Sequence, residues 1–314
     1  MALQKIENTF FLQTPEHFFT DKNGLPNAYN DMNPSLYIKP DGLIILLIRK
    51  INYRKFTDNR FVMGEEKSNS KYVLMTGHHF DDLSSSDIEY DWGSFEKHNT
   101  YWEGMEDIRF INEHLMLVTV PERNINGNPC IFLANLHLGD SKIRLISKLE
   151  PSFMEKNWMP YVHNGNIFVI YSVVPLIVKP LIDNNKFEID LKSGAIHDLL
   201  GYHGSTNSVM YNGSHLFLIH KNNNRTCHRW LSFNPDTNAI QYSDPFIFYK
   251  NTYIEFPCSL CYYNNKFYIS LGVNDKNALV AVISPDDIVL KDSPALSVAM
   301  AKSNNDISLG EMII

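Results

Sequence analysis

A short segment of the chain, Gly104-Met-Glu-Asp-Ile-Arg109, concentrates side chains that could do chemistry. Successive side chains of a strand point to opposite faces, so one carboxylate could face a cleft while its neighbour pairs with an arginine. A carboxylic acid in a cleft can keep a raised pKa and act as a general acid. The alternative is that Glu106, Asp107 and Arg109 form only a salt bridge between neighbouring parts of the fold.

Further polar residues stand at the ends of strand-like segments. Those before a segment are Asn33, Lys156, Asn157, His203 and Glu255, and those after one are Arg49, Tyr171, Ser172, His220 and Asp275. Such groups are costly to bury unless they pair with each other or bind a ligand. If the fold gathers them, the cationic and imidazole side chains would suit phosphate; these are Arg49, Arg109, Lys156 and His220. Aromatic residues could stack on sugars or belong to the core; these are Trp92, Tyr101, Trp102, Trp158 and Tyr171.

Five hairpin signals position these residues. Turns near 41, 112, 164, 212 and 264 each separate two strand-like segments, the second of which is almost wholly apolar. Asn-Gly and Asp-Gly between apolar strands are the strongest hairpin signals, because both turn positions need a positive φ. The turns recur at intervals of 71, 52, 48 and 52 residues. One hairpin about every 50 residues is typical of a propeller blade of four strands.

We therefore expect an all-β fold, a five-bladed β-propeller that forms a single domain over residues 1–314. Outer strands are predicted at Lys71–Thr76, Cys130–Leu138, Lys142–Lys148, His228–Phe233 and Ala278–Ile283. Asn52–Gly64 is expected to be an inserted loop, and the tail at 294–314 a closing strand, a short helix or disorder. A β-sandwich with several hairpins is the alternative. The apolar second strands favour blades, in which strands are buried on both faces.

The composition agrees with a strand-rich fold and excludes some partners. The 314 residues include only ten Ala but 33 Asn, 19 Phe and 16 Tyr, and these favour strands and turns over helices. A net charge of −7 argues against a nucleic-acid partner or a basic membrane-binding face. The longest apolar run, Leu43–Ile48, is too short to span a membrane, and residues 1–20 lack a signal-peptide core. We expect a cytoplasmic protein without membrane insertion, and no feature specifies an oligomeric state.

Metal-binding patterns are weak. Cys258 and Cys261 have the spacing of a zinc or redox pair, but no second pair follows and both fall on a predicted strand. His78-His79 with Asp81-Asp82 is expected to be a solvated loop. We therefore expect neither a metal nor a cofactor.

The segment Gly104–Arg109 resembles the Gly-x-Glu-Asp-Pro-Arg signature of glycoside hydrolase family 130, five-bladed propellers that act on β-mannosides; Ile108 stands in place of the proline. Other segments resemble the family in the same order, over about residues 30 to 285: Asn33-Pro-Ser with Leu47-Ile-Arg49, Glu155-Lys-Asn-Trp158 with Tyr171-Ser172, Leu218-Ile-His220, and Tyr253-Ile-Glu255 with Ser270–Asp275 and Ala278. The family contains inverting phosphorylases and some hydrolases. It is related to mannosyltransferases of glycosyltransferase family 108.

The resemblance implies a role for each matching residue. Asp107 would be the catalytic general acid, acting through a neighbouring sugar hydroxyl. Phosphate would be bound by Arg49, Lys156 and His220. The sugar-binding candidates are Asn33, Glu106, Arg109, Asn157, Trp158, Tyr171, Glu255 and Asp275. A second phosphate-binding arginine of the family has no match here; Arg144 and Lys148 are the nearby candidates.

We therefore expect an inverting carbohydrate-active enzyme that transfers a mannose-like unit between a β-linked glycan and phosphate or a phosphate-bearing donor. The partner would be an oligosaccharide or glycan, and inorganic phosphate, a sugar phosphate or a nucleotide sugar would be the second substrate. Hydrolysis would need another carboxylate to activate water, for which Glu255 and Asp275 are candidates. The alternative outside enzymes is a non-catalytic glycan-binding propeller.

Overall fold

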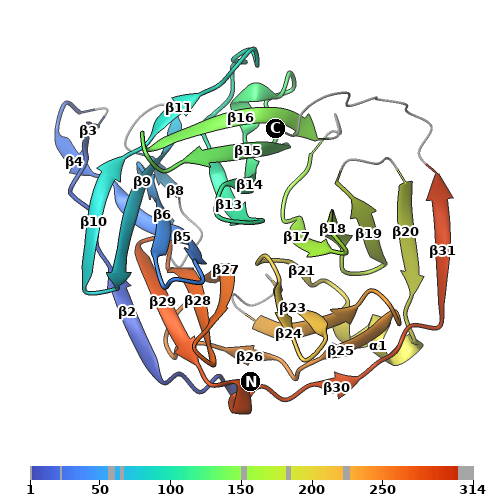
Figure 1. Ribbon diagram of the computed structural model, residues 1–314. Coiled ribbons are helices and arrows are strands. Elements are labelled where there is room, and N and C mark those ends of the chain that lie inside the picture. Colours follow the sequence, from blue (N-terminus) through green and yellow to red (C-terminus); the bar gives the residue numbers. More distant parts are fainter. Residues whose placement is uncertain are drawn as a thin grey trace.

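The computed structural model describes residues 2–21, 23–55, 61–63, 67–149, 154–181, 185–221 and 227–302. Over these ranges the chain forms five sheets of four or more strands, which surround a common centre as the blades of a propeller (Figure 1). This arrangement confirms the predicted all-β, five-bladed fold. Among the described residues, no helix is long and apolar enough to cross a membrane.

Each blade is an antiparallel meander numbered here along the chain. Blade 1 contains β5 (Asn30–Ile38), β6 (Ile44–Ile51), β9 (Ser68–His79) and β10 (Asp82–Asp87). Blade 2 contains β13 (Glu106–Phe110), β14 (Leu115–Thr119), β15 (Ile131–His137) and β16 (Lys142–Leu149). Blade 3 contains β17 (Met159–His163), β18 (Asn166–Ser172), β19 (Leu176–Pro180) and β20 (Asn185–Asp190). Blade 4 contains β21 (His203–Gly204), β22 (Val209–Tyr211), β23 (Ser214–Lys221), β24 (Cys227–Asn234) and β25 (Ala239–Tyr242). Blade 5 contains β27 (Glu255–Tyr263), β28 (Lys266–Val273) and β29 (Asn277–Ile283), and β2 (Asn8–Leu12) completes it.

The predicted hairpin turns join β5 to β6, β13 to β14, β17 to β18, β22 to β23 and β27 to β28. The two Asn-Gly turns have the expected positive φ at both residues: 50° and 76° at Asn164 and Gly165, and 48° and 76° at Asn212 and Gly213. The five predicted outer strands correspond to β9, β15, β16, β24 and β29. The second strands are buried as predicted, and in β6 all eight residues are buried.

The core is divided among the blade interfaces. Five hydrophobic clusters each join residues of two neighbouring blades, so every interface of the ring has its own cluster. Between blades 1 and 2, for example, Leu47 and Leu74 pack with Val118 and Phe132. Because each blade buries both faces against neighbours, the second strands must be apolar on both sides.

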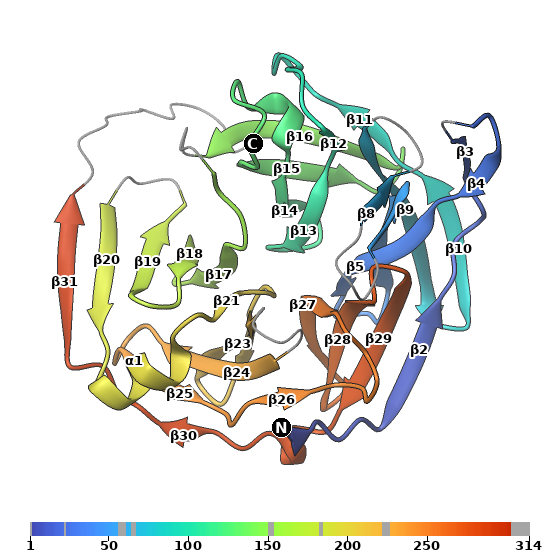
Figure 2. The same ribbon diagram turned by 180° about the vertical axis from the view of Figure 1, so that it is seen from behind.

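The ring is closed by the N-terminal strand. β2 pairs antiparallel with β29, so the start of the chain supplies the outermost strand of the last blade (Figure 2). From the sequence, the tail at 294–314 is expected to be a closing strand, a short helix or disorder. Its described part contains a strand, but this strand does not close the ring. Its strand β31 (Ser297–Lys302) pairs with β20 at the outer edge of blade 3, and residues 303–314 lie outside the described residues.

Short elements connect or extend the blades. Part of the predicted loop at Asn52–Gly64 is a hairpin of β7 (Tyr53–Lys55) and β8 (Phe61–Met63), with residues 56–60 and 64 outside the described residues. Edge strands pair with blade strands: β11 (Glu89–Asp91) with β16, β12 (Trp102–Gly104) with β9, and β30 (Lys291–Asp292) with β25. β1 (Ala2–Leu3) pairs with β26 (Phe246–Ile247), and β3 (Phe18–Thr20) with β4 (Pro26–Ala28). The helical elements are α1 (Ser193–Leu199) and the 3₁₀ turns at Pro121–Arg123 and Pro285–Asp287.

Candidate active site

Extra residues in the innermost strands aim polar side chains at the centre of the ring. In β5 the pairing with β6 shifts between Met32 and Ser35, and in β13 the pairing with β14 shifts in the same way between Glu106 and Arg109. An extra residue of this kind is a β-bulge, which re-aims a side chain and is common next to active sites. Asn33 and Asp107 occupy equivalent bulge positions with left-handed φ values of 39° and 45°. Asn and Asp tolerate this conformation better than other non-glycine residues.

Similar backbone irregularities occur in two other blades. Asn157, just before β17, has a φ of 64°. In β27 the register shifts between Pro257 and Ser259, which leaves Cys258 as the extra residue. The irregular positions of blades 1, 2, 3 and 5 are therefore occupied by Asn33, Asp107, Asn157 and Cys258.

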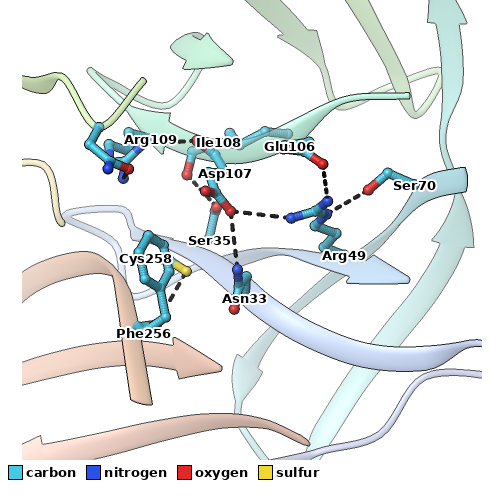
Figure 3. Close-up of polar contacts among 11 residues, drawn as sticks. Asn33, Ser35, Arg49, Ser70, Glu106, Asp107, Ile108, Arg109, Phe256 and Cys258 are labelled. Atoms are coloured by element: carbon cyan, nitrogen blue, oxygen red, sulfur yellow. Dashed lines mark hydrogen bonds and ion pairs between the residues drawn. The ribbon is translucent and has the colours of Figure 1, made fainter. Parts of the chain in front are cut away.

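The Asp107 carboxylate lies at the middle of a hydrogen-bonded cluster (Figure 3). Its Oδ1 atom accepts a hydrogen bond from Asn33 Nδ2 at 3.1 Å and one from Arg49 Nη1 at 3.4 Å. Arg49 also pairs with Glu106, with 2.5 Å between Nη2 and Oε1, and its Nε donates to Ser70 Oγ at 2.5 Å. The side chains of Glu106 and Asp107 are 21% and 19% exposed, whereas that of Arg49 is 4% exposed. We call these four residues, Asn33, Arg49, Glu106 and Asp107, the carboxylate–arginine centre.

The centre places one cation, Arg49, between two carboxylates. Burial alone would lower the pKa of Arg49, but Glu106, Tyr53, Asp107 and Tyr72 together outweigh it and raise the pKa above the ordinary arginine value. Arg49 is therefore a permanent cation. For Glu106 the burial wins over the attraction of Arg49, so the pKa of this carboxyl is raised. Desolvation of the charged form explains the direction. The centre thus contains a fixed cation and a carboxyl that gains a proton more readily than a surface glutamate.

Arg109 braces the bulge instead of facing a ligand. Its Nη1 donates to the backbone carbonyl of Asp107 at 3.2 Å, its Nη2 to Asn157 Oδ1 at 3.4 Å, and its Nε to the carbonyl of Ser205. The residue is 1% exposed, and burial lowers its pKa. Arg109 therefore joins the inner strands of blades 2, 3 and 4, which does not match its expected contact with sugar.

Glycines allow the neighbouring strands to approach the bulges. A Cβ atom on Gly104 would lie 2.1 Å from the carbonyl oxygen of Ser70, and one on Gly272 would lie 2.1 Å from Asn33 Oδ1. Gly104 also has a φ of 87°. Only glycine fits these two positions, so the first residue of the Gly104–Arg109 segment has a steric role.

The two other predicted phosphate ligands differ in environment. Lys156 is exposed, and its charge acts on both Glu106 and His220, which places it beside the centre. His220 is 3% exposed, and its Nδ1 lies 2.7 Å from Ser205 Oγ. Burial holds the pKa of His220 well below the usual value, and the neighbouring His228 adds to this effect. His220 is therefore a neutral imidazole that can hydrogen-bond but does not supply a positive charge.

Glu255 does not reach the centre, which corrects the expectation that it contacts sugar or activates water. Its side chain has no exposed area. One carboxylate oxygen accepts from the backbone amide of Phe248 at 2.9 Å, and the other accepts from the amide of Tyr249 at 2.7 Å and from Thr252 Oγ1 at 2.8 Å. Despite burial, hydrogen bonds and the adjacent His228 lower its pKa. Glu255 fixes the loop before β27.

Of the predicted sugar-stacking aromatics in blade 3, Trp158 is buried and Tyr171 is half-buried. Trp158 is 3% exposed, and its Nε1 donates to Glu155 at 3.0 Å. Tyr171 donates to the same carboxylate at 2.8 Å, and the Lys179 ammonium lies 3.4 Å from the centre of its ring. The structure therefore assigns Trp158 to the core between blades 2 and 3, not to a sugar-binding surface.

Of the remaining candidate residues, Asp275 lies near the centre, whereas Arg144 and Lys148 do not. Asp275, in the turn after β28, is half-buried with a φ of 49° and acts electrostatically on Tyr53, which lies beside Arg49 and Glu106. Arg144 and Lys148 lie on the outer strand β16, where Arg144 pairs with Asp91 and Lys148 with Asn124. Neither of these two cations is in the centre. Cys258 and Cys261 are free buried thiols, and the described residues contain no group of three potential metal ligands.

Three residues that support or adjoin the centre were not predicted from the sequence. Ser70 positions Arg49, Ser205 contacts both Arg109 and His220, and Tyr53 lies beside the charges of the centre. Ser205 belongs to the predicted fourth repeat, so its place near the axis could have been inferred. The position of Ser70 depends on the register of β6 and β9, and that of Tyr53 on the chain that follows β6; no local pattern reveals either.

No family model and no curated protein sequence matches the chain. Solved structures do match over most of its length. A glycosyl hydrolase from Bacteroides ovatus is 12% identical with a TM-score of 0.55, covering 94% of this chain and 97% of the other. The β-1,2-mannobiose phosphorylase from Listeria innocua is 11% identical with a TM-score of 0.52, covering 83% and 91%.

A third match comes from the GH130 family of mannoside phosphorylases, which contains glycoside hydrolases that target β-1,2-mannosidic linkages in Candida mannan. It is 12% identical with a TM-score of 0.54, covering 84% of this chain and 86% of the other. At such identities the likeness establishes the fold. The chain therefore has the propeller fold found in GH130 mannoside phosphorylases and in other glycoside hydrolases.

Proposed function

We propose that the protein is an inverting carbohydrate-active enzyme that transfers a mannose-like unit between a β-linked glycan and phosphate or a phosphate-bearing donor. The observation that supports this best is the partly open Asp107 carboxylate, which a β-bulge holds against Asn33 and Arg49 at the centre of the ring. The fold shared with glycoside hydrolases and phosphorylases is consistent with this proposal.

In the proposed reaction Asp107 is the general acid. Its proton passes to the leaving glycosidic oxygen, through a hydroxyl of the sugar, as the bond to the anomeric carbon breaks. A phosphate oxygen forms the new bond from the opposite face, so the configuration inverts. Arg49 and Asn33 hold Oδ1 of Asp107 in place throughout. In the synthetic direction the same steps run backwards from a sugar phosphate or nucleotide sugar.

Phosphate would enter beside Lys156. This exposed lysine is the cation nearest to solvent among the predicted ligands, and Arg49 lies deeper, at 3% exposure. The raised pKa of Glu106 supports the proposal, because a protonated Glu106 would release Arg49 to attract an anion. His220 would add a neutral hydrogen bond.

Hydrolysis in the same centre is the second candidate. It is favoured by the pairing of Arg49 with two carboxylates, which reduces its attraction for phosphate. Because Glu255 is enclosed, Asp275 is left as the base that would activate water. A non-catalytic glycan-binding propeller is the alternative from another class.

The test is a mass-spectrometric time course with β-1,2- and β-1,4-mannobiose, with and without inorganic phosphate. We expect a hexose 1-phosphate that forms only when phosphate is present and disappears in Asp107→Asn. Asp87→Asn is the matched control, because this aspartate side chain is 75% exposed, contacts His17 and lies on the outer strand β10 of blade 1. Free mannose in both samples would favour hydrolysis. No product from any of these, or from nucleotide-sugar donors, would contradict the enzyme proposal and leave a binding protein.

A further inference from the structure

An aromatic pair lies beside the carboxylate–arginine centre. The rings of Trp102 and Tyr53 meet edge-to-face, with 6.1 Å between their centroids. Trp102 belongs to the edge strand β12, four residues before Glu106, and its side chain is 37% exposed. Tyr53 follows Arg49 by four residues, at the start of β7, and is 8% exposed. The pair thus has an inner, buried member and an outer member that reaches solvent.

Tyr53 connects the pair to the centre. Burial raises the pKa of its phenol, and the charges that act on it are those of Arg49, Glu106, Asp275 and Asp107. Three of them, Arg49, Glu106 and Asp107, belong to the carboxylate–arginine centre. The Trp102 indole packs against the Tyr53 ring, so an exposed indole contacts a residue on which the charges of the centre act.

The strand that carries Trp102 is firmly held. Trp102 pairs with Ser68 in parallel register, and the Ser68 amide donates to the Tyr101 carbonyl at 2.8 Å. The next residue, Glu103, points to the opposite side and pairs with Lys67 at 2.8 Å and Lys97 at 2.9 Å. The indole is therefore presented by a fixed backbone and not by a loose loop.

We propose that Trp102, supported by Tyr53, binds the second sugar ring of the glycan, next to the mannose-like unit held at Asp107. The inference rests on the proposed function and names a residue that selects oligosaccharides over single sugars. Sugar rings have apolar faces, and large rigid aromatic rings bind such faces at low entropic cost. Polar groups that fix orientation beside an apolar wall are typical of small-molecule sites.

Calorimetric titrations in the Asp107→Asn background test this, because the sugars then survive the measurement. The probes are mannose, β-1,2-mannobiose and β-1,4-mannobiose. We expect Trp102→Ala to raise the Kd of the better-bound mannobiose by about tenfold and to leave the Kd of mannose unchanged. Trp102→Phe should recover most of the loss. Phe11→Ala is the matched control, since this aromatic side chain is 74% exposed on the outer strand β2 of blade 5.

The outcomes separate the two proposals. If the parent binds mannose and mannobiose and Trp102→Ala changes neither Kd, or changes both equally, the second-ring site is wrong and the proposed function stands. If the parent binds none of the sugars, the proposed function fails and the second-ring site fails with it. Thermal melting of each variant checks that a lost affinity is not lost folding.

Discussion

Two glutamates begin equivalent inner strands of this propeller, yet their side chains differ in exposure and in hydrogen-bond partners. Glu106 starts β13 and Glu255 starts β27. The Glu106 side chain is 21% exposed and pairs with the Arg49 side chain of the next blade. The Glu255 side chain is fully buried and accepts hydrogen bonds from two backbone amides and a threonine of its own loop.

The comparison shows what separates an accessible carboxylate from an enclosed one in this ring. A carboxylate that is saturated by local backbone donors has a lowered pKa and no access to a ligand, as Glu255 shows. One that is desolvated and pairs with a cation from another blade has a raised pKa, as Glu106 shows, because desolvation is the largest cause. Function in this protein is therefore expected where blades 1 and 2 meet, and structural roles where blades 4 and 5 meet.

The largest expected effect is the loss of turnover when Asp107 in the carboxylate–arginine centre is replaced. Asp107→Asn should lower the rate by about 10³-fold or more, because general acid catalysis contributes on this scale. The melting temperature should change little, since an amide oxygen can still accept from Asn33 and Arg49. Steady-state rates beside those of Asp87→Asn measure the effect, and equal rates for the two variants would contradict it.

Removing Arg49 should cost both stability and activity. Arg49→Gln leaves two carboxylates without their cation, which we expect to destabilise the protein by about 3 kcal/mol. Adding Glu106→Gln should restore most of the stability but not the activity. Urea unfolding of the single and double variants measures the coupling, and additive losses would show that the pair does not act as a unit.

Glu255→Gln should lower the stability of the protein but leave its rate nearly unchanged, which is the reverse of what we expect for Asp107→Asn. The NH2 group of the glutamine replaces one of the two carboxylate oxygens and cannot accept from the backbone amide that this oxygen faces, so we expect a loss of about 1–3 kcal/mol in the free energy of unfolding. Well below the melting temperature, the rate should stay within about twofold of the parent. A large loss of rate in a folded Glu255→Gln protein would place Glu255 in the reaction after all.

Stability should fall in acid because of buried imidazoles. Burial lowers the pKa of His215 from 6.5 to about 4, and that of His220 falls well below 6.5. The unfolded chain therefore binds protons below about pH 6.5 that the folded chain excludes, so lowering the pH favours unfolding. The contribution of His215 to the free energy of unfolding is fully present above pH 6.5 and is lost as the pH falls towards 4. This loss is about 3 kcal/mol at most.

Melting temperatures at pH 7.5 and pH 5 measure this acid effect. His215→Asn should reduce the difference between the two values. The same difference in the variant as in the parent would show that His215 is not responsible.

The smallest effect is expected at the exposed edge of the centre. Lys156→Ala should raise the KM for phosphate by about three- to tenfold and leave the melting temperature unchanged, because a solvated lysine contributes little to stability. An unchanged KM for phosphate would show that phosphate does not bind beside Lys156.

The blades could be predicted because their signals are local. Asn164-Gly165 and Asn212-Gly213 form turns that need a positive φ, and apolar runs such as Leu43–Ile48 mark strands buried on both faces. The closing strand β2 and the role of the tail could not be predicted, because they depend on pairing between segments that are about 270 and 110 residues apart in the chain.

The site could be predicted only in part. The Gly104–Arg109 segment and the repeats indicated that Asn33, Arg49 and Asp107 would converge, and the structure brings these three together. Residue type could not separate Glu106 from Glu255, or an exposed indole such as Trp102 from the enclosed Trp158. Those distinctions depend on the donors and neighbours that the fold supplies, which one sequence does not display.

The central claim is that Asp107 acts as the acid of an inverting transfer on a β-mannoside. Proton NMR of the first product formed from β-1,2- or β-1,4-mannobiose, recorded before mutarotation, tests it most directly. The account predicts an α-configured product, either α-mannose 1-phosphate with phosphate present or α-mannose without it, and no product with Asp107→Asn. A β-configured first product, or α-product formed equally fast by Asp107→Asn, would contradict the account.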